Sequence, residues 1–255
     1  MIDLIVVNYK TYGLIGRFLA SYRKFKPSID SRLILVDNES DQNQLYRLNL
    51  DGVDVYPFKE NLGYSGACNF AASLGNSEFI AFLNSDTEFV DNKCVDTCVD
   101  YLATHEDVAV VGPLQYSNSG MVTHGGIFGT HSKPEHRGWR SKSKKNFRDV
   151  RDAVTVQGSA LFTKRSIWDQ MTNCSIFRET FPGTPGAFGP FPHFYDETLY
   201  NYHVYGHGYK CVYLGTAEMI HEWHQSSEIG SQAGNMKIGR EGFREFCDNH
   251  GIPHD

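Results

Sequence analysis

The chain has 255 residues, of which 40% are hydrophobic and 21% are charged, with a net charge of −6. This composition is typical of a globular domain with a sizeable core, and the negative charge argues against nucleic acid as a partner. No apolar run approaches the roughly 18 residues of a membrane-spanning helix. The opening MIDLIVVNYK lacks the basic region and cleavage site of a signal peptide, so a cytoplasmic location is expected.

Apolar runs without polar alternation predict buried β-strands in the first half of the chain, over residues 2–8, 32–38, 53–58, 78–86 and 108–114. Apolar residues at helical spacing, small residues or a capping aspartate predict helices between these strands, over residues 14–25, 64–74 and 91–105. This alternation favours an α/β fold with a mostly parallel central sheet that helices cover on both faces.

The second half is less regular. Strand character returns over residues 154–168 and 209–215, and the last twenty residues have a helical pattern around FREFC. A loop rich in Pro, Gly and Phe, residues 181–197, ends in two acids. Neither a repeat nor a linker divides the sequence, which therefore predicts a single domain over residues 1–255.

Three of the predicted strands end in polar residues, at Asn8, at Asp37–Asn38 and at Asn84–Ser85–Asp86. Ligands of α/β sheets bind at the carboxyl ends of strands, so these endings together predict one shared pocket. The sequence contains neither GxGxxG after the first strand nor GxxxxGK[ST]. Asp86 is suited to holding Mg²⁺ or Mn²⁺ at a diphosphate, and a turn or helix cap is the alternative.

Later in the chain, two further pairs carry groups suited to chemistry. Asp196 and Glu197 offer a general base, or else acids that favour a helix N-terminus. His221 and His224, three residues apart, offer an imidazole ligand for a metal, or else two structural histidines.

The six cysteines show neither a disulfide-like nor a zinc-like spacing, and Cys94 and Cys98 are expected to be buried thiols on one helix face. Residues 129–152 hold eight Lys or Arg against three acids. A solvated loop is one interpretation of this basic segment, and a patch that meets an anionic acceptor is the other.

In their order and spacing, these motifs resemble the GT-A-fold glycosyltransferases of family 2, especially the rhamnosyltransferase-like members. The resemblance covers residues 3–227 and rests on IVVNY, LILVDNES, ENLGYSGACNFAA, FLNSD, VQGSALFTKRSIW, DETLYNYHVYGHGYKCVYL and IHEWHQSS. It implies a nucleotide-sugar half over residues 1–115, an acceptor half over 116–230 and a helical tail over 231–255.

The resemblance implies inverting, metal-dependent transfer of a hexosyl or rhamnosyl group from a UDP- or dTDP-sugar to a glycan, lipid-linked or protein acceptor, in the cytoplasm or peripheral to a membrane. Glu197, with Asp196 as the close second, would be the catalytic base. Asp86 and His221 would bind Mn²⁺ or Mg²⁺. The implied donor-binding residues are Asn8, Tyr9, Asp37, Asn38, Asn61, Gly63, Asn84, Ser85 and Gly158.

Two departures from the family pattern keep alternatives open. Asn84 stands where the metal motif has its first acid, and the acid pair reads Asp-Glu instead of Glu-Asp. The first departure favours a catalytically degenerate module that binds a sugar nucleotide or glycan. A nucleotidyltransferase of similar topology is a third reading, although NYKTYGLIG does not match its usual Gly-rich loop.

Overall fold

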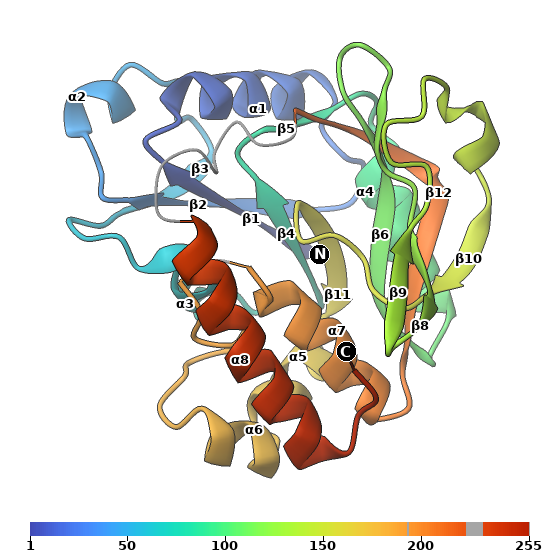
Figure 1. The fold of residues 1–255 in the computed structure, drawn as a ribbon. Helices are drawn as coiled ribbons and strands as arrows, with labels where there is room; N and C mark the ends of the chain where they lie inside the picture. The colour runs from blue at the N-terminus through green and yellow to red at the C-terminus, as the bar shows by residue number, and fades with distance from the viewer. Residues whose placement is uncertain (193, 223–231, 255) are drawn as a thin grey trace.

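The computed structural model describes residues 1–192, 194–222 and 232–254. Within them, ten strands form one sheet whose main path runs β10-β12-β6-β11-β4-β1-β2-β3, with β5 paired to β12 and β7 to β6 (Figure 1). The strands of this sheet are β1 (Ile2–Tyr9), β2 (Ser31–Asn38), β3 (Val53–Pro57), β4 (Phe79–Asn84), β5 (Thr87–Phe89), β6 (Val108–Tyr116), β7 (Val122–His124), β10 (Val150–Ala153), β11 (Ala160–Lys164) and β12 (Lys210–His221). A separate hairpin joins β8 (Ile127–Thr130) to β9 (Lys133–His136).

The sheet is parallel over β4-β1-β2-β3 and again between β6 and β12. The five apolar runs of the first half form β1, β2, β3, β4 and β6, as predicted. Side chains along β1 alternate between the two faces, since Leu4 and Val6 pack in one core cluster and Ile5 and Val7 in the other. Because both faces are buried, the run reads as continuously apolar.

The strand predicted over residues 154–168 is too long. The structure confines β11 to Ala160–Lys164, and α5 (Arg165–Thr172) begins at the next residue. Ile167 and Trp168 are buried as helix residues on one apolar face, which a short sequence window does not distinguish from a buried strand. The strand predicted over 209–215 instead extends to His221, because its end pairs with β5.

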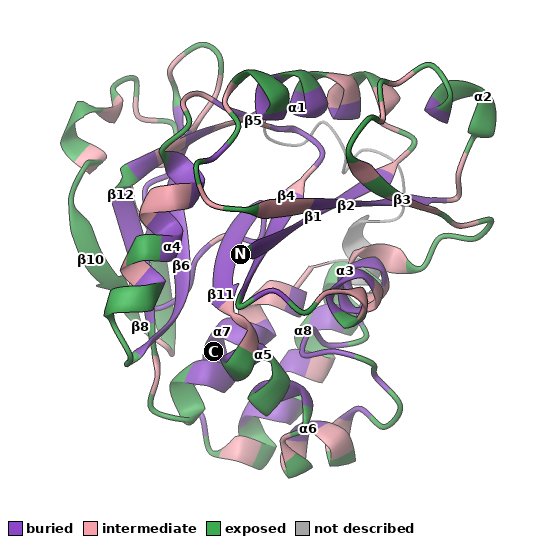
Figure 2. Cartoon of the chain, turned by 180° about the vertical axis from the view of Figure 1, so that it is seen from behind, coloured by how far each residue is buried: buried purple, intermediate pink, exposed green. Residues whose placement is uncertain are grey.

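Helices cover both faces of the sheet, as predicted (Figure 2). One face packs against α1 (Tyr12–Lys24) and α4 (Cys94–Thr104), where Cys94 and Cys98 are buried free thiols. The other face packs against α3 (Gly63–Leu74), α5 and α7 (Asp196–Gly206). Two short helical segments, α2 (Gln42–Leu45) and the 3₁₀ turn η1 (Lys144–Phe147), lie in connections.

The C-terminal helix α8 (Gln232–His250) packs below the sheet against α7 and against α6 (Ser175–Thr180) (Figure 1). A third hydrophobic cluster joins these three helices and includes Phe177, Phe243 and Phe246. Among the described residues, no helix has both the length and the apolar character required to cross a bilayer.

Some of the basic side chains of residues 129–152 form ion pairs. Lys144 and Arg148 both pair with Glu218 of β12, at 2.5 and 2.6 Å, and Arg137 pairs with Asp149 at 2.8 Å. The two pairs with Glu218 connect residues 144–148 to β12, whereas Arg140, Lys142 and Lys145 of the same segment are exposed.

Candidate functional site

The carboxylate of Asp37 is held at the carboxyl end of β2 by three neighbours. The parallel register places Asn8 beside Asp37, and the Asn8 Nδ2 group donates to Asp37 Oδ1 at 2.6 Å. The hydroxyls of Tyr12 and Ser40 donate to Asp37 Oδ2 at 3.1 and 2.5 Å. A carboxylate accepts about four hydrogen bonds, so this buried group is fixed in orientation and retains one acceptor position.

Asn38 joins the end of β2 to the turn before α3. Its Nδ2 group donates to Gly63 O at 3.1 Å, and its Oδ1 accepts from the Leu62 N–H at 3.3 Å. Asn61 Oδ1 accepts from the Gly63 N–H at 2.9 Å. Gly63 has a φ of +72°, and a Cβ there would lie 3.1 Å from Pro192 O. A side chain at this position is therefore disfavoured on two grounds.

Tyr9 lies at the rim of the same edge. Its hydroxyl donates to Glu39 Oε2 at 3.2 Å, and Lys10 Nζ lies 2.5 Å from Glu39 Oε1. The hydrogen bond from Lys10 lowers the pKa of Glu39 below its ordinary value. Lys10 and Glu39 both have positive φ, at 58° and 51°, so the chain turns sharply after β1 and after β2.

Asp86 and His221 come together although 135 positions separate them in the sequence. The short strand β5 pairs antiparallel with the end of β12, which sets Thr87 opposite His221. His221 Nε2 then lies 3.5 Å from Asp86 Oδ1, and both side chains are buried. The Glu222 N–H donates to Asp86 O at 3.0 Å and closes the turn. His224 lies outside the described residues.

Asn84 and Ser85 link this pair to the rest of the edge. Ser85 Oγ lies 3.0 Å from Thr11 Oγ1, which also donates to Asn8 Oδ1 at 2.8 Å. The Asn84 N–H donates to Ser159 O at 3.0 Å. The ends of β1, β2 and β4 therefore share one hydrogen-bonded edge that also reaches the segment before β11.

The donor atoms of Asp86 and His221 suit a divalent cation. Carboxylate oxygen is the preferred ligand type of Mg²⁺ and Mn²⁺, and imidazole nitrogen is accepted by Mn²⁺. The 3.5 Å between Nε2 and Oδ1 allows one ion to contact both atoms. Asn84 adds no charge, so Asp86 provides the only carboxylate within the FLNSD motif.

The acid pair begins α7 after two residues with unusual backbone geometry. Phe194 and Tyr195 have φ values of 68° and 67°, a strained conformation for side chains of this size. Asp196 is buried, and its Oδ2 accepts from Ser65 Oγ of α3 at 3.2 Å. Glu197 is only half-buried. Of the two acids, Glu197 is therefore the one that a ligand can reach.

Burial raises the pKa of Glu197 well above its ordinary value, and the adjacent Asp196 carboxylate raises it further. Backbone hydrogen bonds at Glu197 and Gly158 act in the opposite direction and are smaller. A carboxyl group with a raised pKa is a stronger base when it ionises, which suits proton abstraction.

Gly158 sits directly against this carboxyl group. A Cβ at position 158 would lie 2.8 Å from Glu197 Cγ and 3.0 Å from Glu197 Cδ. The Tyr64 hydroxyl donates to Gly158 O at 3.1 Å and holds this backbone in place. Gly158 therefore leaves the space that the Glu197 side chain occupies.

Three aromatic rings of the loop at residues 181–197 pack into the hydrophobic cores. Phe181 and Phe191 pack on each other with ring centroids 5.6 Å apart, and Phe188 packs on Phe82 at 4.6 Å. These three rings are buried and complete the cores below the sheet, whereas Phe194 and Tyr195 of the same loop are half-buried. The loop and the turn at residues 61–63 line a cavity of about 710 Å³.

The sequence did not predict the side chains that hold the predicted site residues in their orientations. Tyr12 and Ser40 fix Asp37, Ser65 reaches Asp196, and Thr11 connects Asn8 to Ser85. Ser40 follows Asp37 by three positions, a turn spacing that offered a local signal. The contact between Ser65 and Asp196 spans 131 positions and has no local signal.

Comparison with known proteins places this site in context. The model of the family described as "Glycosyl transferase family 2" matches residues 3–170. No curated protein matches the chain. Solved structures with a similar fold include the mannosyltransferase PcManGT from Pyrobaculum calidifontis in complex with GDP-Man and Mn²⁺, at a TM-score of 0.61 and 15% identity, covering 94% of this chain and 60% of that chain.

Two further structures are GalNAc-T7 with UDP, GalNAc and Mn²⁺, and S. aureus TarS 1–349 with UDP-GlcNAc. GalNAc-T7 has a TM-score of 0.67 at 13% identity, over 100% of this chain and 55% of its own. TarS has a TM-score of 0.62 at 15% identity, over 97% of this chain and 66% of its own. The chain thus spans 55–66% of the length of these three chains. The likeness confirms the predicted GT-A fold.

Proposed function

The chain belongs to glycosyl transferase family 2, and we propose that it transfers a sugar from a nucleoside diphosphate sugar to an acceptor hydroxyl with inversion at the anomeric carbon. One observation carries this proposal. The segment Gly158–Ser159 contacts Glu197 on one side and Asn84, at the end of β4, on the other. It therefore sets the acid pair beside the strand end that leads to Asp86 and His221.

The donor nucleotide would bind along the hydrogen-bonded strand ends. Asp37 would contact a hydroxyl of the ribose or an N–H of the base once the donor displaces one of the side chains that cover its buried carboxylate, and Asn8 and Tyr9 line the same edge. Asn38 and Asn61 shape the turn at Gly63. Asn84, Ser85 and Gly158 complete the wall toward the transferred sugar. A UDP- or dTDP-sugar carrying a hexosyl or rhamnosyl group is the expected donor.

Asp86 and His221 would hold the Mn²⁺ or Mg²⁺ ion, which, when bound, offsets the negative charge that builds on the leaving diphosphate. Glu197 would accept the proton of the acceptor hydroxyl as the acceptor oxygen bonds to the anomeric carbon and the bond from that carbon to the phosphate oxygen breaks. Asp196 would keep the pKa of Glu197 raised. In this proposal, residues 1–115 form a nucleotide-sugar half and residues 116–230 form an acceptor half, followed by the helical tail.

The proposal is tested by incubating the full chain with UDP- and dTDP-sugars, Mn²⁺ and a panel of glycan, lipid-linked and protein acceptors. Release of free nucleoside diphosphate together with a glycosylated acceptor is expected. The absence of an acid at position 84 supports the alternative of a binding module. Binding of a donor sugar without any release of diphosphate would favour that module, and release of pyrophosphate would identify a nucleotidyltransferase.

Removal of divalent cations is expected to abolish transfer, because the Asp86 carboxylate cannot itself offset the negative charge of the leaving diphosphate and would do so only through the cation that it holds with His221. Transfer is measured in excess EDTA and then after Mn²⁺ is restored. Mn²⁺ should recover the activity of the wild type but not that of Asp86→Asn. Asp100→Asn, at an exposed position of α4, is the control and should behave as the wild type. Full activity in EDTA would contradict the metal assignment.

Gly158→Ala is expected to lower kcat by up to about 10²-fold. The new methyl group would clash with the Glu197 side chain and shift its carboxyl group away from the position needed for proton transfer. Donor affinity, measured by calorimetry, should change little. Gly13→Ala is the control for expression and folding, since Gly13 is exposed in α1 and a Cβ there meets no atom within 4 Å. If Gly158→Ala keeps the wild-type kcat, the absence of a side chain at residue 158 is not required for the catalytic role of Glu197.

A further inference from the structure

The helices α6, α7 and α8 meet below the sheet, apart from the carboxyl edge (Figure 1). Four side chains of types that can ligate metals lie at this junction. Cys174 precedes α6, His203 and His207 lie one turn apart on α7, and His250 ends α8. Ligand atoms of Cys174, His203 and His250 all lie within 4.8 Å of one another. His207 Nε2 lies 3.6 Å from Cys174 Sγ.

The histidines of this cluster have unsatisfied nitrogens. His203 is completely buried, and within the described residues neither of its ring nitrogens has a hydrogen-bond partner. His250 Nε2 is likewise buried without a partner in the described part of the chain. Buried polar atoms of native proteins are nearly always bonded to protein, water or an ion. A ligand is therefore expected between these side chains.

Aromatic packing fixes the His203 ring but does not satisfy its nitrogens. The ring stacks on Phe177 at 5.6 Å with an interplanar angle of 9°, and it meets Phe246 at 4.9 Å.

We propose that Cys174, His203, His207 and His250 bind one Zn²⁺ ion at a structural site. Thiolate and imidazole ligands favour zinc over Mg²⁺ and Mn²⁺. Tetrahedral zinc with its usual bond lengths places a sulfur and a nitrogen ligand about 3.5 Å apart. The 3.6 Å between Cys174 Sγ and His207 Nε2 matches this spacing. The ligand atoms of Cys174, His203 and His250, which lie within 4.8 Å of one another, would draw closer on binding, and the His207 ring, whose centroid lies 5.1 Å from that of His203 and 6.0 Å from that of His250, would move toward them. On binding, the Cys174 thiol releases its proton to solvent.

The ion would reach the site from solvent, because His207 is exposed and Cys174 and His250 are half-buried. Once bound, it joins three helices that are otherwise held by apolar packing. One of them, α8, also reaches the residues before the acid pair, since Arg240 Nε donates to the Tyr195 hydroxyl at 3.1 Å. Zinc binding therefore stabilises the docking of α8 beside the start of α7.

The spacing of these residues along the chain resembles no zinc motif, which is why the sequence did not predict the site. Cys174 and His250 are 76 positions apart and meet only because α8 folds back over α6 and α7. The i, i+4 spacing of His203 and His207 on a helix is the one local signal.

The experiment uses the full chain without a histidine tag, stripped of metal and titrated with Co²⁺ and then Zn²⁺. One equivalent of Co²⁺ is expected to give a sulfur-to-cobalt charge-transfer band, which Zn²⁺ abolishes by displacement. The pair Asp86 and His221 offers no sulfur, so cobalt bound there gives no such band. Zn²⁺ should also raise the Tm of the stripped protein.

Cys174→Ser should remove the charge-transfer band. Both Cys174→Ser and His250→Gln should weaken zinc affinity by at least about tenfold, because loss of a side chain that only hydrogen-bonds to a metal ligand already costs this much. These two positions are half-buried, so the variants are expected to fold, unlike changes at His203. His105→Gln, at an exposed position stacked on Tyr101, is the control and should retain wild-type affinity. A stripped wild type without the band, or zinc affinity unchanged in Cys174→Ser, would overturn the proposal.

Discussion

Replacing Glu197 by glutamine is expected to lower kcat for sugar transfer by on the order of 10²–10⁴-fold, the usual contribution of a general base. The amide has nearly the same volume as the carboxyl group, so it fits the space beside Gly158 but accepts no proton. Donor affinity should stay close to that of the wild type, because Glu197 acts on the acceptor. Initial rates of diphosphate release, with calorimetry of donor binding, measure the two quantities separately.

The same substitution should not destabilise the fold. The pKa of Glu197 is raised in the folded protein, so its favourable contribution to the free energy of unfolding is complete below its ordinary pKa of 4.5 and is lost as pH rises through the raised value. At neutral pH, glutamine removes a carboxylate that is held beside Asp196. Urea unfolding of Glu197→Gln at pH 7 should give a free energy at least equal to that of the wild type.

The pH profile of the wild type provides a second readout. Because Glu197 must be ionised to accept a proton, kcat is expected to rise with pH through a value well above 4.5. Asp196→Asn removes the neighbouring charge that raises this pKa, so its profile should move to lower pH while most of kcat remains. A dead Asp196→Asn together with a nearly normal Glu197→Gln would show that the two acids have the opposite roles.

The sequence predicted the parallel part of the fold well, since strands buried on both faces, such as β1 and β2, are continuously apolar. It did not predict that β11 runs antiparallel between β4 and β6, because local composition does not encode the direction of a strand. It also missed the three-residue strand β5, which is too short to show a period. The pairing of β5 with β12 places His221 beside Asp86, so the proposed metal site depends on a strand that the sequence did not predict.

The predicted site residues lie along one edge, although their chemical roles stay predictions. Asn8, Asp37 and Asn38 end neighbouring parallel strands, where topology alone brings them together. The contacts through which Tyr12 and Ser65 orient Asp37 and Asp196 depend on how α1 and α3 pack against the sheet. Local sequence patterns do not reveal this packing. The basic segment illustrates the same limit, because its pairing with Glu218 joins positions about 70 residues apart.

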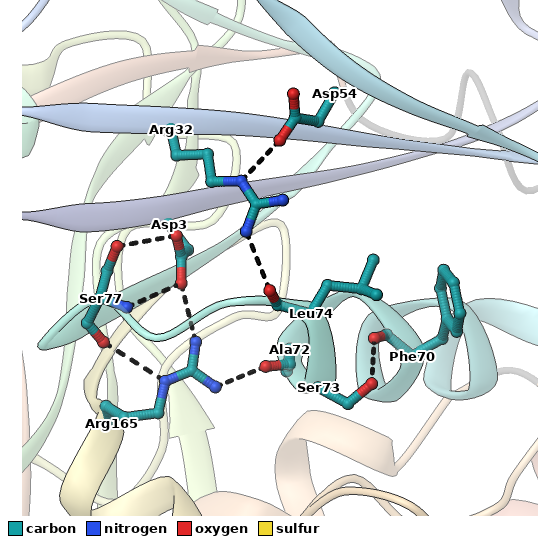
Figure 3. Close-up of polar contacts among 9 residues, drawn as sticks. All are labelled: Asp3, Arg32, Asp54, Phe70, Ala72, Ser73, Leu74, Ser77 and Arg165. Carbon is teal, nitrogen blue, oxygen red and sulfur yellow. Dashed lines mark hydrogen bonds and ion pairs between the residues drawn. The ribbon is translucent and has the colours of Figure 1, made fainter.

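A buried ion pair between Asp3 and Arg165 lies at the end of the sheet opposite the candidate site (Figure 3). Asp3 of β1 is completely buried, and its Oδ2 accepts from Arg165 Nη2 at 2.8 Å. Ser77 donates to the same carboxylate through its N–H and its hydroxyl, at 3.2 and 2.8 Å. Arg165 also donates to the carbonyl oxygens of Ala72 and Ser77, at 2.5 and 3.3 Å. The pair thus joins β1, the end of α3 and the start of α5.

Arg165→Met is expected to lower the free energy of unfolding by about 3–5 kcal/mol, because it leaves the Asp3 carboxylate buried without its counter-charge. Arg32→Met is the matched control, since Arg32 pairs with Asp54 at 2.6 Å near the surface and, like Arg165, also donates to a carbonyl oxygen of α3, that of Leu74 at 2.9 Å (Figure 3). Such exposed pairs contribute about 0–1 kcal/mol. Urea unfolding of both variants measures the difference.

The double variant Asp3→Asn, Arg165→Met separates charge from packing. If the uncompensated carboxylate causes the loss, replacing it with a neutral amide should recover a large part of the stability that Arg165→Met removes, although the carbonyl oxygens of Ala72 and Ser77 still lack their donor. No recovery would show that Arg165 acts mainly through those carbonyls and its packing. An Arg165→Met protein as stable as Arg32→Met would show instead that the buried pair is no more stabilising than a surface one.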